Sequence, residues 1–337
     1  MASDEEISRQ LTALVRAKTG DSSAQVSPLT TLPGHAGQSY SFDLESGSGA
    51  ARKRERLVLR LAPEGVRPVG TADVVRQARI MKSLEGTAVP VPRVRWLDDD
   101  AAAFGRGYFV VDFVRGDKLA MGEEEHSPAD QQRFARSIVR TLAALHTVPW
   151  EPRRAVWGDP RPLLEEMARF DGLLDRPNLD PKTTVGSAEL RERLRATMPP
   201  TPQIGLVHGD FQWSNSLCAG EGVQVVIDWE LALVGATSID LGWLCLFSDR
   251  KSWVDQGLIP SHAPAPEELA DIYRESVPWS VSDADLRWFR AFAGYRFGAI
   301  TAFNLMLHRR GKRPDPTWED IALSAPLLFG RGRELIA

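Results

Sequence analysis

The sequence predicts an α+β fold in which a mostly antiparallel sheet with one packed helix precedes a largely helical region. Segments 39–44 and 56–61 alternate apolar and polar residues around a turn rich in Gly and Ser, which is typical of a β-hairpin. Segments 4–18 and 71–84 instead place apolar residues at helical spacing. Helical patterns then dominate the rest of the chain.

Each N-terminal element carries one apolar face, and these faces predict a common core. Thr71 is the expected N-cap of the second helix, and the apolar run 108–111 predicts a further strand. The expected core residues are Ile7, Leu11, Leu14, Val15, Tyr40, Phe42, Leu44, Leu57, Leu59, Leu61, Val74, Ala78, Met81 and Leu84.

The C-terminal part is predicted to contain one strand pair, 204–207 with 223–227, among its helices. Its longest helix is expected at 283–310, where Ser282 is a suitable N-cap and basic residues at the end suit the helix dipole. We therefore expect an N-terminal lobe at 1–113 and a C-terminal lobe at 114–337.

Composition restricts the classes of function. The chain has 337 residues, 43% of them hydrophobic, and a net charge of −4, so it can bury a full core, and its charge predicts neither nucleic acid nor membrane as a general partner. Two cysteines, Cys218 and Cys245, are too few for a disulfide framework and indicate buried thiols in a reducing compartment. With neither a signal peptide nor a membrane span in the pattern, we expect a cytoplasmic protein, either a monomer or a homodimer.

Polar side chains follow the two predicted C-terminal strands. His208 ends the first strand, the turn at Gly209 presents Asp210, and Asn215 comes five residues later. The second strand ends in Asp228. If the strands are neighbours, the two acids and the amide converge; carboxylate and amide oxygens suit Mg²⁺, and a remaining carboxylate can accept a proton. Taken singly, each of these residues is also common in ordinary turns and caps.

Three motifs carry a resemblance to a known family: HGDFQWSN at 208–215, IDWELALVG at 227–235 and DLGWL at 240–244. Together they resemble the signature of aminoglycoside phosphotransferases and choline kinases, most closely the subgroup associated with acyl-CoA dehydrogenases. The likeness extends from about residue 25 to about residue 315 and includes VPVPRV at 89–94. It implies a bilobal protein-kinase-like fold, and transfer of the γ-phosphoryl group of ATP to a hydroxyl of a small molecule.

The resemblance also implies roles for residues of the motifs. Asp210 matches the catalytic base, and Asn215 and Asp228 match the Mg²⁺ ligands. His208 matches the residue that ties down the catalytic loop, and Asp240 matches a carboxylate that anchors this loop from the following helix.

On the nucleotide side, the resemblance implies a loop over the phosphates that contains Gly34 and Gly37. Val58 matches a position over the adenine. The segment that begins at Val111 and includes Phe113 matches the hinge that hydrogen-bonds the adenine edge.

The sequence departs from the kinase pattern at two of these nucleotide-binding positions. Arg60 stands where kinases carry the phosphate-binding lysine, and Gln77 stands where its glutamate partner is expected. Arginine can grip phosphate directly, but Gln77 offers no charge. An alternative is therefore a catalytically impaired nucleotide-binding protein that acts as a scaffold or sensor. A protein kinase is disfavoured because the sequence has no counterpart of an activation segment that ends in an APE-like motif.

For the acceptor, the subgroup resemblance implies hydroxylated acyl or other lipid-derived metabolites. Separately, His146 ends an apolar helix and is expected to be a hydrogen-bonded packing residue. The candidate substrate-pocket residues, of mixed charge, are Trp213, Glu230, Asp249, Arg250, Trp253 and Arg296.

Overall fold

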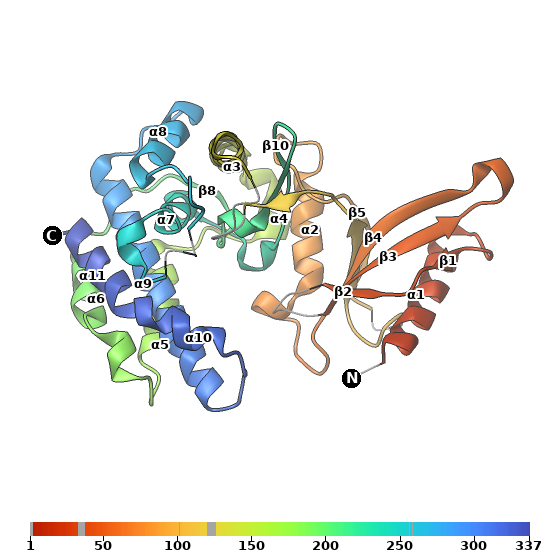
Figure 1. Ribbon diagram of the computed structural model, residues 1–337, viewed down its shortest axis with the longest axis horizontal. Helices are drawn as coiled ribbons and strands as arrows, with labels where there is room; N and C mark the ends of the chain where they lie inside the picture. The colour runs from red at the N-terminus through yellow and green to blue at the C-terminus, as the bar shows by residue number, and fades with distance from the viewer. Residues whose placement is uncertain (1–2, 33–37, 101, 120–125, 256, 258) are drawn as a thin grey trace. The chain divides into compact units, whose positions relative to one another are not determined.

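The computed structural model of the protein describes residues 3–32, 38–100, 102–119, 126–255, 257 and 259–337. The chain, coloured by residue number in Figure 1, divides into two units. The N-terminal unit consists of Met1–Arg115 and Gln224–Ala232, and the C-terminal unit consists of Gly116–Val223 and Leu233–Ala337. The segment Gln224–Ala232, which includes Asp228, therefore packs with the N-terminal unit, although it lies far from it in the sequence.

The N-terminal unit is built on a six-stranded antiparallel sheet of order β1-β3-β4-β6-β5, with β2 paired to β3. The predicted hairpin is confirmed as β3 and β4, and the predicted strand at 108–111 as β6. The strands are β1 (Gln25–Val26), β2 (Thr30–Leu32), β3 (Gln38–Ser46), β4 (Lys53–Leu61), β5 (Val94–Asp98) and β6 (Tyr108–Asp112).

Two helices complete this unit, α1 (Asp4–Thr19) and α2 (Val74–Leu84). The predicted apolar stripes are buried in both helices, and the stripe of α1 joins the inward faces of β3 and β4 in one core. The predicted cap of α2 was wrong: the helix starts after Asp73, whose side chain accepts a hydrogen bond from the N–H of Arg76. Thr71 lies instead in a short 3-10 turn, Gly70–Ala72. The helix begins only after this turn because the carboxylate of Asp73, two residues past Thr71, is the N-cap.

The C-terminal unit is mostly helical and is organised around the long helix α9, which packs against α5, α6, α7, α10 and α11 (Figure 1). The predicted start of α9 is confirmed, since Ser282 accepts a hydrogen bond from the N–H of Asp285. None of the helices in the described part of the chain combines the length and the hydrophobicity that a membrane crossing requires. The helices are α3 (Pro128–Thr147), α4 (Arg154–Trp157), α5 (Leu163–Leu174), α6 (Ser187–Ala196), α7 (Ser238–Leu246), α8 (Pro266–Ser276), α9 (Asp283–Arg309), α10 (Thr317–Ile321) and α11 (Ala325–Leu335).

The strand pairing predicted for the C-terminal part was wrong. β8 (Ile204–Val207) pairs antiparallel with β11 (Leu233–Ala236), and β10 (Gly222–Val226) lies next to β9 (Ser216–Ala219), which in turn pairs with β7 (Asp117–Lys118). A tight turn after β9 gives β10 a partner a few residues away, so little loop-closure entropy is lost. The argument that placed Asp210 and Asp228 at adjacent strand ends therefore does not hold.

The two cysteines, Cys218 and Cys245, are free and buried, as predicted. Burial raises the pKa of each thiol to about 12, which keeps both in the unreactive thiol form at neutral pH.

The close packing of α7 against α9 requires glycine at position 242. A Cβ atom there would lie 2.4 Å from the carbonyl oxygen of Phe289. We predict that Gly242→Ala lowers the free energy of unfolding by about 2–3 kcal/mol, because the two backbones must separate. Gly172 is a matched control, since it lies within α5 and a Cβ there meets no atom within 4 Å. Gly172→Ala should raise stability by about 0.5–1 kcal/mol, through higher helix propensity. Chemical denaturation of both variants would check these opposite signs, and equal effects would contradict the close approach.

Candidate active site

Three side-chain N–H groups hold the carboxylate of Asp210, two of them from the loop after β8 and one from α7. Oδ1 accepts hydrogen bonds from Nε1 of Trp243 at 2.9 Å and from Nε2 of Gln212 at 3.1 Å. Oδ2 accepts one from Nδ2 of Asn215 at 2.9 Å, and the same nitrogen also donates to the backbone oxygen of Asp210 at 2.8 Å. These bonds bring two of the predicted site residues together and fix the orientation of the carboxylate.

Asp240, at the start of α7, fastens this loop from below. Its Oδ2 accepts a hydrogen bond from the N–H of His208 at 2.6 Å, and its Oδ1 accepts one from the N–H of Gly209 at 2.8 Å. The side chain is fully buried, and Nε2 of His146 lies 3.3 Å from Oδ2. Burial by itself raises the pKa of Asp240, but the hydrogen bonds and the nearby His146 and His208 outweigh burial and hold the pKa below its ordinary value.

His146 is the buried, hydrogen-bonded packing residue that its sequence context predicts. Its Nδ1 lies 2.7 Å from the hydroxyl of Tyr273, and its other ring nitrogen faces Asp240. The ring is thus held on both sides and orients the carboxylate below the loop.

Arg296, from the middle of α9, lies beneath the same loop. Its Nη2 donates to the backbone oxygen of Gly209 at 2.9 Å, and its guanidinium carbon lies 4.6 Å from the centroid of the Trp243 ring. Burial lowers the pKa of Arg296, against the opposing effect of Glu166, Asp240 and other carboxylates nearby. Within the described residues, Nε and Nη1 have no hydrogen-bond acceptor. Arg296 therefore supports the loop and the indole that holds Asp210.

The second group of predicted residues lies in the N-terminal unit. Nη2 of Arg60 lies 3.3 Å from Oε2 of Glu230, and its Nη1 lies 3.7 Å from Oδ1 of Asp228. The Arg60 side chain is only 16% exposed, so most of it is shielded from solvent. Arg60, Asp228 and Glu230 thus form one charged cluster.

Asp228 has an unusual backbone conformation. Its φ of 71° and ψ of 53° lie in the left-handed region, which disfavours residues other than glycine, although Asp tolerates it better than most. Its Oδ1 is buried and accepts no hydrogen bond from the described residues. A carboxylate held in this conformation with an unsatisfied oxygen fits a cation ligand. The described residues contain no cluster of three His, Cys, Asp or Glu side chains that could hold a metal by itself.

Residues 39–272 match the Phosphotransferase enzyme family. The chain belongs to this family. The match covers more than half of the sequence and includes the loop of Asp210 and the segment of Asp228.

Solved structures show the protein-kinase-like fold of this phosphotransferase. A Ralstonia eutropha protein assigned to the aminoglycoside phosphotransferases aligns over 97% of both chains with a TM-score of 0.79 and 20% identity. A choline/ethanolamine kinase family protein from Mesorhizobium loti aligns over 98% of this chain and 94% of its own, with a TM-score of 0.59 and 18% identity. A thermostable mutant of aminoglycoside phosphotransferase APH(4)-Ia, in ternary complex with ADP and hygromycin B, has a TM-score of 0.63 and 14% identity over 97% of this chain and 98% of its own.

Two curated relatives carry acyl-CoA dehydrogenase names. One, from Arabidopsis thaliana, is 27% identical over 79% of this chain, and the other, acyl-CoA dehydrogenase family member 10 from Mus musculus, is 25% identical over 73% of it. The match covers 35% and 24% of these relatives. The phosphotransferase therefore corresponds to about a third or less of each.

Of the residues predicted to lie near the adenine, Val58 pairs with Val111 across β4 and β6. The N–H of Phe113, in the predicted hinge, donates to the backbone oxygen of Arg56 at 3.0 Å, so it is already hydrogen-bonded. The predicted phosphate-loop residues Gly34 and Gly37 lie outside the described residues.

Four of the candidate pocket residues in the phosphotransferase are engaged in packing. Trp213 and Trp253 are buried, and each indole N–H donates to a backbone oxygen, at 2.9 Å and 2.8 Å. Asp249 is buried and binds two arginines, each at 2.9 Å. Arg250 donates to backbone oxygens at 3.3 Å and 2.9 Å. These contacts favour structural roles for all four residues.

Sequence reasoning did not assign to Trp243 or Gln212 the task of holding Asp210. Both residues lie inside the quoted motifs, so the signal was present in the sequence. What the motif could not show is that the indole N–H of Trp243, which follows Asp240 by three residues, points to the carboxylate of Asp210.

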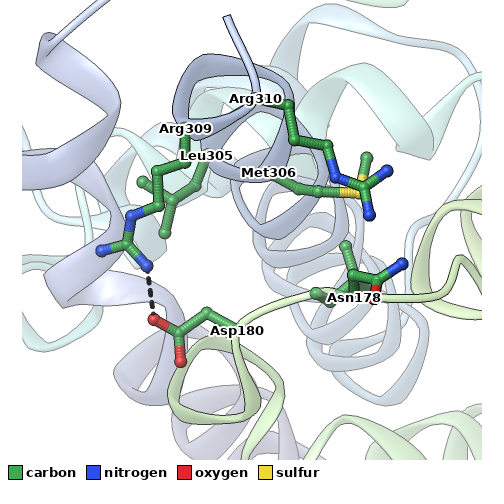
Figure 2. A pocket seen from close by; sticks show the side chains of 7 residues that line it. Asn178, Asp180, Leu305, Met306, Arg309 and Arg310 are labelled. Carbon is green, nitrogen blue, oxygen red and sulfur yellow. Dashed lines mark hydrogen bonds and ion pairs between the residues drawn. The ribbon is translucent and has the colours of Figure 1, made fainter.

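A cavity of about 190 Å³ lies at the C-terminal end of α9, apart from the loop of Asp210 (Figure 2). Asn178, Asp180, Met306, Arg309 and Arg310 contribute to its wall. Figure 2 shows the ion pair between Arg309 and Asp180, whose atoms Nη1 and Oδ2 are 2.7 Å apart. None of the predicted site residues lines this cavity.

Replacement of the loop anchor should be costly. We predict that Asp240→Asn lowers the free energy of unfolding by about 3 kcal/mol at pH 7, because the amide cannot serve as an ionised acceptor for both backbone N–H groups. The pKa of Asp240 is lowered on folding, so its contribution is present above the unfolded value of about 3.9 and is lost as the pH falls through the folded value.

Urea denaturation at a series of pH values would measure the free energy of unfolding of wild type and Asp240→Asn. The difference between the two should become smaller below about pH 4. Asp159→Asn is the control, since this carboxylate is 69% exposed in its pair with Arg154 and should matter by less than about 0.5 kcal/mol. A gap that stays constant into acid would show that the charge of Asp240 is not what anchors the loop.

Proposed function

We propose that the protein is an ATP-dependent kinase that phosphorylates a hydroxyl group of a small molecule. The observation that carries this proposal is the carboxylate of Asp210, oriented by three side-chain N–H groups on a loop that Asp240 fastens. Membership of the phosphotransferase family supports the reaction type. The ADP bound in one structural neighbour supports an adenine nucleotide as the donor.

In the proposed reaction, Asp210 aligns the acceptor hydroxyl and accepts its proton. The hydroxyl oxygen forms a bond to the γ-phosphorus of ATP, the bond from that phosphorus to the bridging oxygen breaks, and ADP leaves. The protein contributes mainly position and charge. Asp210 suits this task because its carboxylate cannot rotate without losing hydrogen bonds to Trp243 and Asn215.

Asn215 and Asp228 are the residues we propose to hold Mg²⁺, which when bound would neutralise charge on the phosphates. The side-chain N–H groups of Asn215 donate hydrogen bonds to Asp210, so the side-chain oxygen of Asn215 is the atom suited to a cation. Asp228 offers the buried Oδ1 described above.

We further propose that the acceptor is a hydroxylated acyl or other lipid-derived metabolite. The support is the likeness to two relatives with acyl-CoA dehydrogenase names, of which this chain matches only a part. The proposed setting is the cytoplasm, with the protein a monomer or homodimer that has neither nucleic acid nor membrane as a partner.

The alternative of an impaired kinase rested on Arg60 and Gln77, which stand where kinases carry a lysine and a glutamate. That alternative loses its main support, because Arg60 has two carboxylates beside it within its own unit. An active enzyme is the better interpretation of this cluster.

Asp210→Asn tests the role of the base. We predict that this variant retains binding of Mg·ATP but loses about 10²–10⁴-fold in kcat, the usual contribution of a positioned base. A screen of hydroxylated acyl compounds, read out as ADP release, would identify the acceptor for the comparison. Turnover of Asp210→Asn at the wild-type rate would contradict the assignment of Asp210 as the base.

Asp228→Ala tests the cation site without an acceptor. Mg·ATP at about 100 times its dissociation constant should stabilise the wild type by about 2.7 kcal/mol, a shift of several degrees in the unfolding midpoint. The variant should lose this shift, because a proposed Mg²⁺ ligand is gone. A full shift in Asp228→Ala, or none in the wild type, would argue against a metal-nucleotide site.

A further inference from the structure

Arg60, on β4, has a carboxylate partner. In protein kinases the helix that corresponds to α2 supplies this carboxylate, but here it comes from another segment. Nη2 of Arg60 donates to Oε2 of Glu230 at 3.3 Å. Glu230 follows Asp228 by two residues, in the segment that packs with the N-terminal unit. The two side chains are only 16% and 21% exposed, so water screens their attraction less than it would at the surface.

The helix α2 contributes a different interaction. Its Gln77 is buried and directs Nε2 towards the backbone oxygen of Thr71, at 3.5 Å. The neighbouring Arg76 donates from Nη2 to the backbone oxygen of Ala232 at 2.9 Å. In place of a carboxylate for Arg60, the helix thus supplies a cation that fastens the end of the segment carrying Glu230.

The two acids beside Arg60 are not equivalent. Glu230 is hydrogen-bonded to the guanidinium, whereas Oδ1 of Asp228 lies 3.7 Å away and has no hydrogen-bond donor among the described residues. Glu230 can therefore keep Arg60 in place while Asp228 turns to a cation.

We propose that Glu230 is the positioning residue for Arg60 and replaces the glutamate that protein kinases carry on this helix, where Gln77 stands here. The inference rests on the proposed phosphoryl transfer, because Arg60 stands where kinases carry the lysine that binds the phosphates of ATP. On this proposal, the position of the Arg60 side chain depends on the segment Asp228–Glu230 and not on a charged residue of α2.

The test moves the carboxylate back to the helix. Affinity for Mg·ATP would be measured calorimetrically in wild type, Glu230→Gln, Gln77→Glu and the double variant. We expect Glu230→Gln to weaken binding about tenfold, equivalent to about 1.4 kcal/mol, because Arg60 then relies on Asp228. The double variant should recover to within about threefold of wild type, since Gln77→Glu returns a carboxylate to the helix position that serves this purpose in protein kinases. Glu45→Gln is the matched control, because it removes a carboxylate paired with Arg52 on the same sheet and should leave affinity unchanged.

Unchanged affinity in Glu230→Gln would overturn the proposal, and so would a loss that Gln77→Glu does not repair. Failure of the wild type to bind Mg·ATP would count against the proposed function instead. In that case the pair is judged by a double-mutant cycle of Arg60→Gln and Glu230→Gln in thermal unfolding. Losses in midpoint that fall short of additivity would support the pair, and strictly additive losses would reject it.

Discussion

The candidate active site depends on one buried carboxylate. Asp240 accepts hydrogen bonds from the backbone N–H groups of His208 and Gly209. These two residues follow the end of β8, where the chain turns. A buried backbone N–H without an acceptor is costly, so the turn can take this form only where such a carboxylate lies beneath it. The carboxylate in turn needs His146 beside it. The position of Asp210, two residues past His208, follows from these contacts.

Arg296 brings the opposite charge to the same place. A buried guanidinium loses its hydration, and only nearby carboxylates, aromatic faces and the oxygen of Gly209 offset that loss. Because Asp240 binds the two N–H groups of the turn and Arg296 binds its carbonyl oxygen, the backbone of Gly209 is held by both charges. The loop is thus fixed by interactions that a neutral core could not supply. This explains why costly buried charges gather under Asp210, although apolar packing would fill the space as well.

Local patterns in the sequence predicted the elements whose contacts are local. The helix at 4–18, the hairpin of β3 and β4, and α9 with its cap at Ser282 all follow from periodicity and caps. The partner of β8 did not, because β11 follows it by some twenty-five residues and several short apolar runs compete for the same edge. The motifs likewise included Asn215 and Asp240, which contact Asp210 and its loop. They could not show which side chain orients which, as with Trp243 and Asp210.

Gln77 shows the limit of reasoning from a single motif position. The reaction needs a cation held near the phosphates, and the cation needs a negative partner; neither requirement specifies the element that supplies it. In this chain the strand arginine finds carboxylates in the segment that begins at Asp228, and α2 is joined to that segment through Arg76 and a backbone oxygen. A substituted helix residue is therefore weak evidence of lost activity, because the same electrostatic condition is met from another direction. The decisive observation is the ion pair itself and not the letter at position 77.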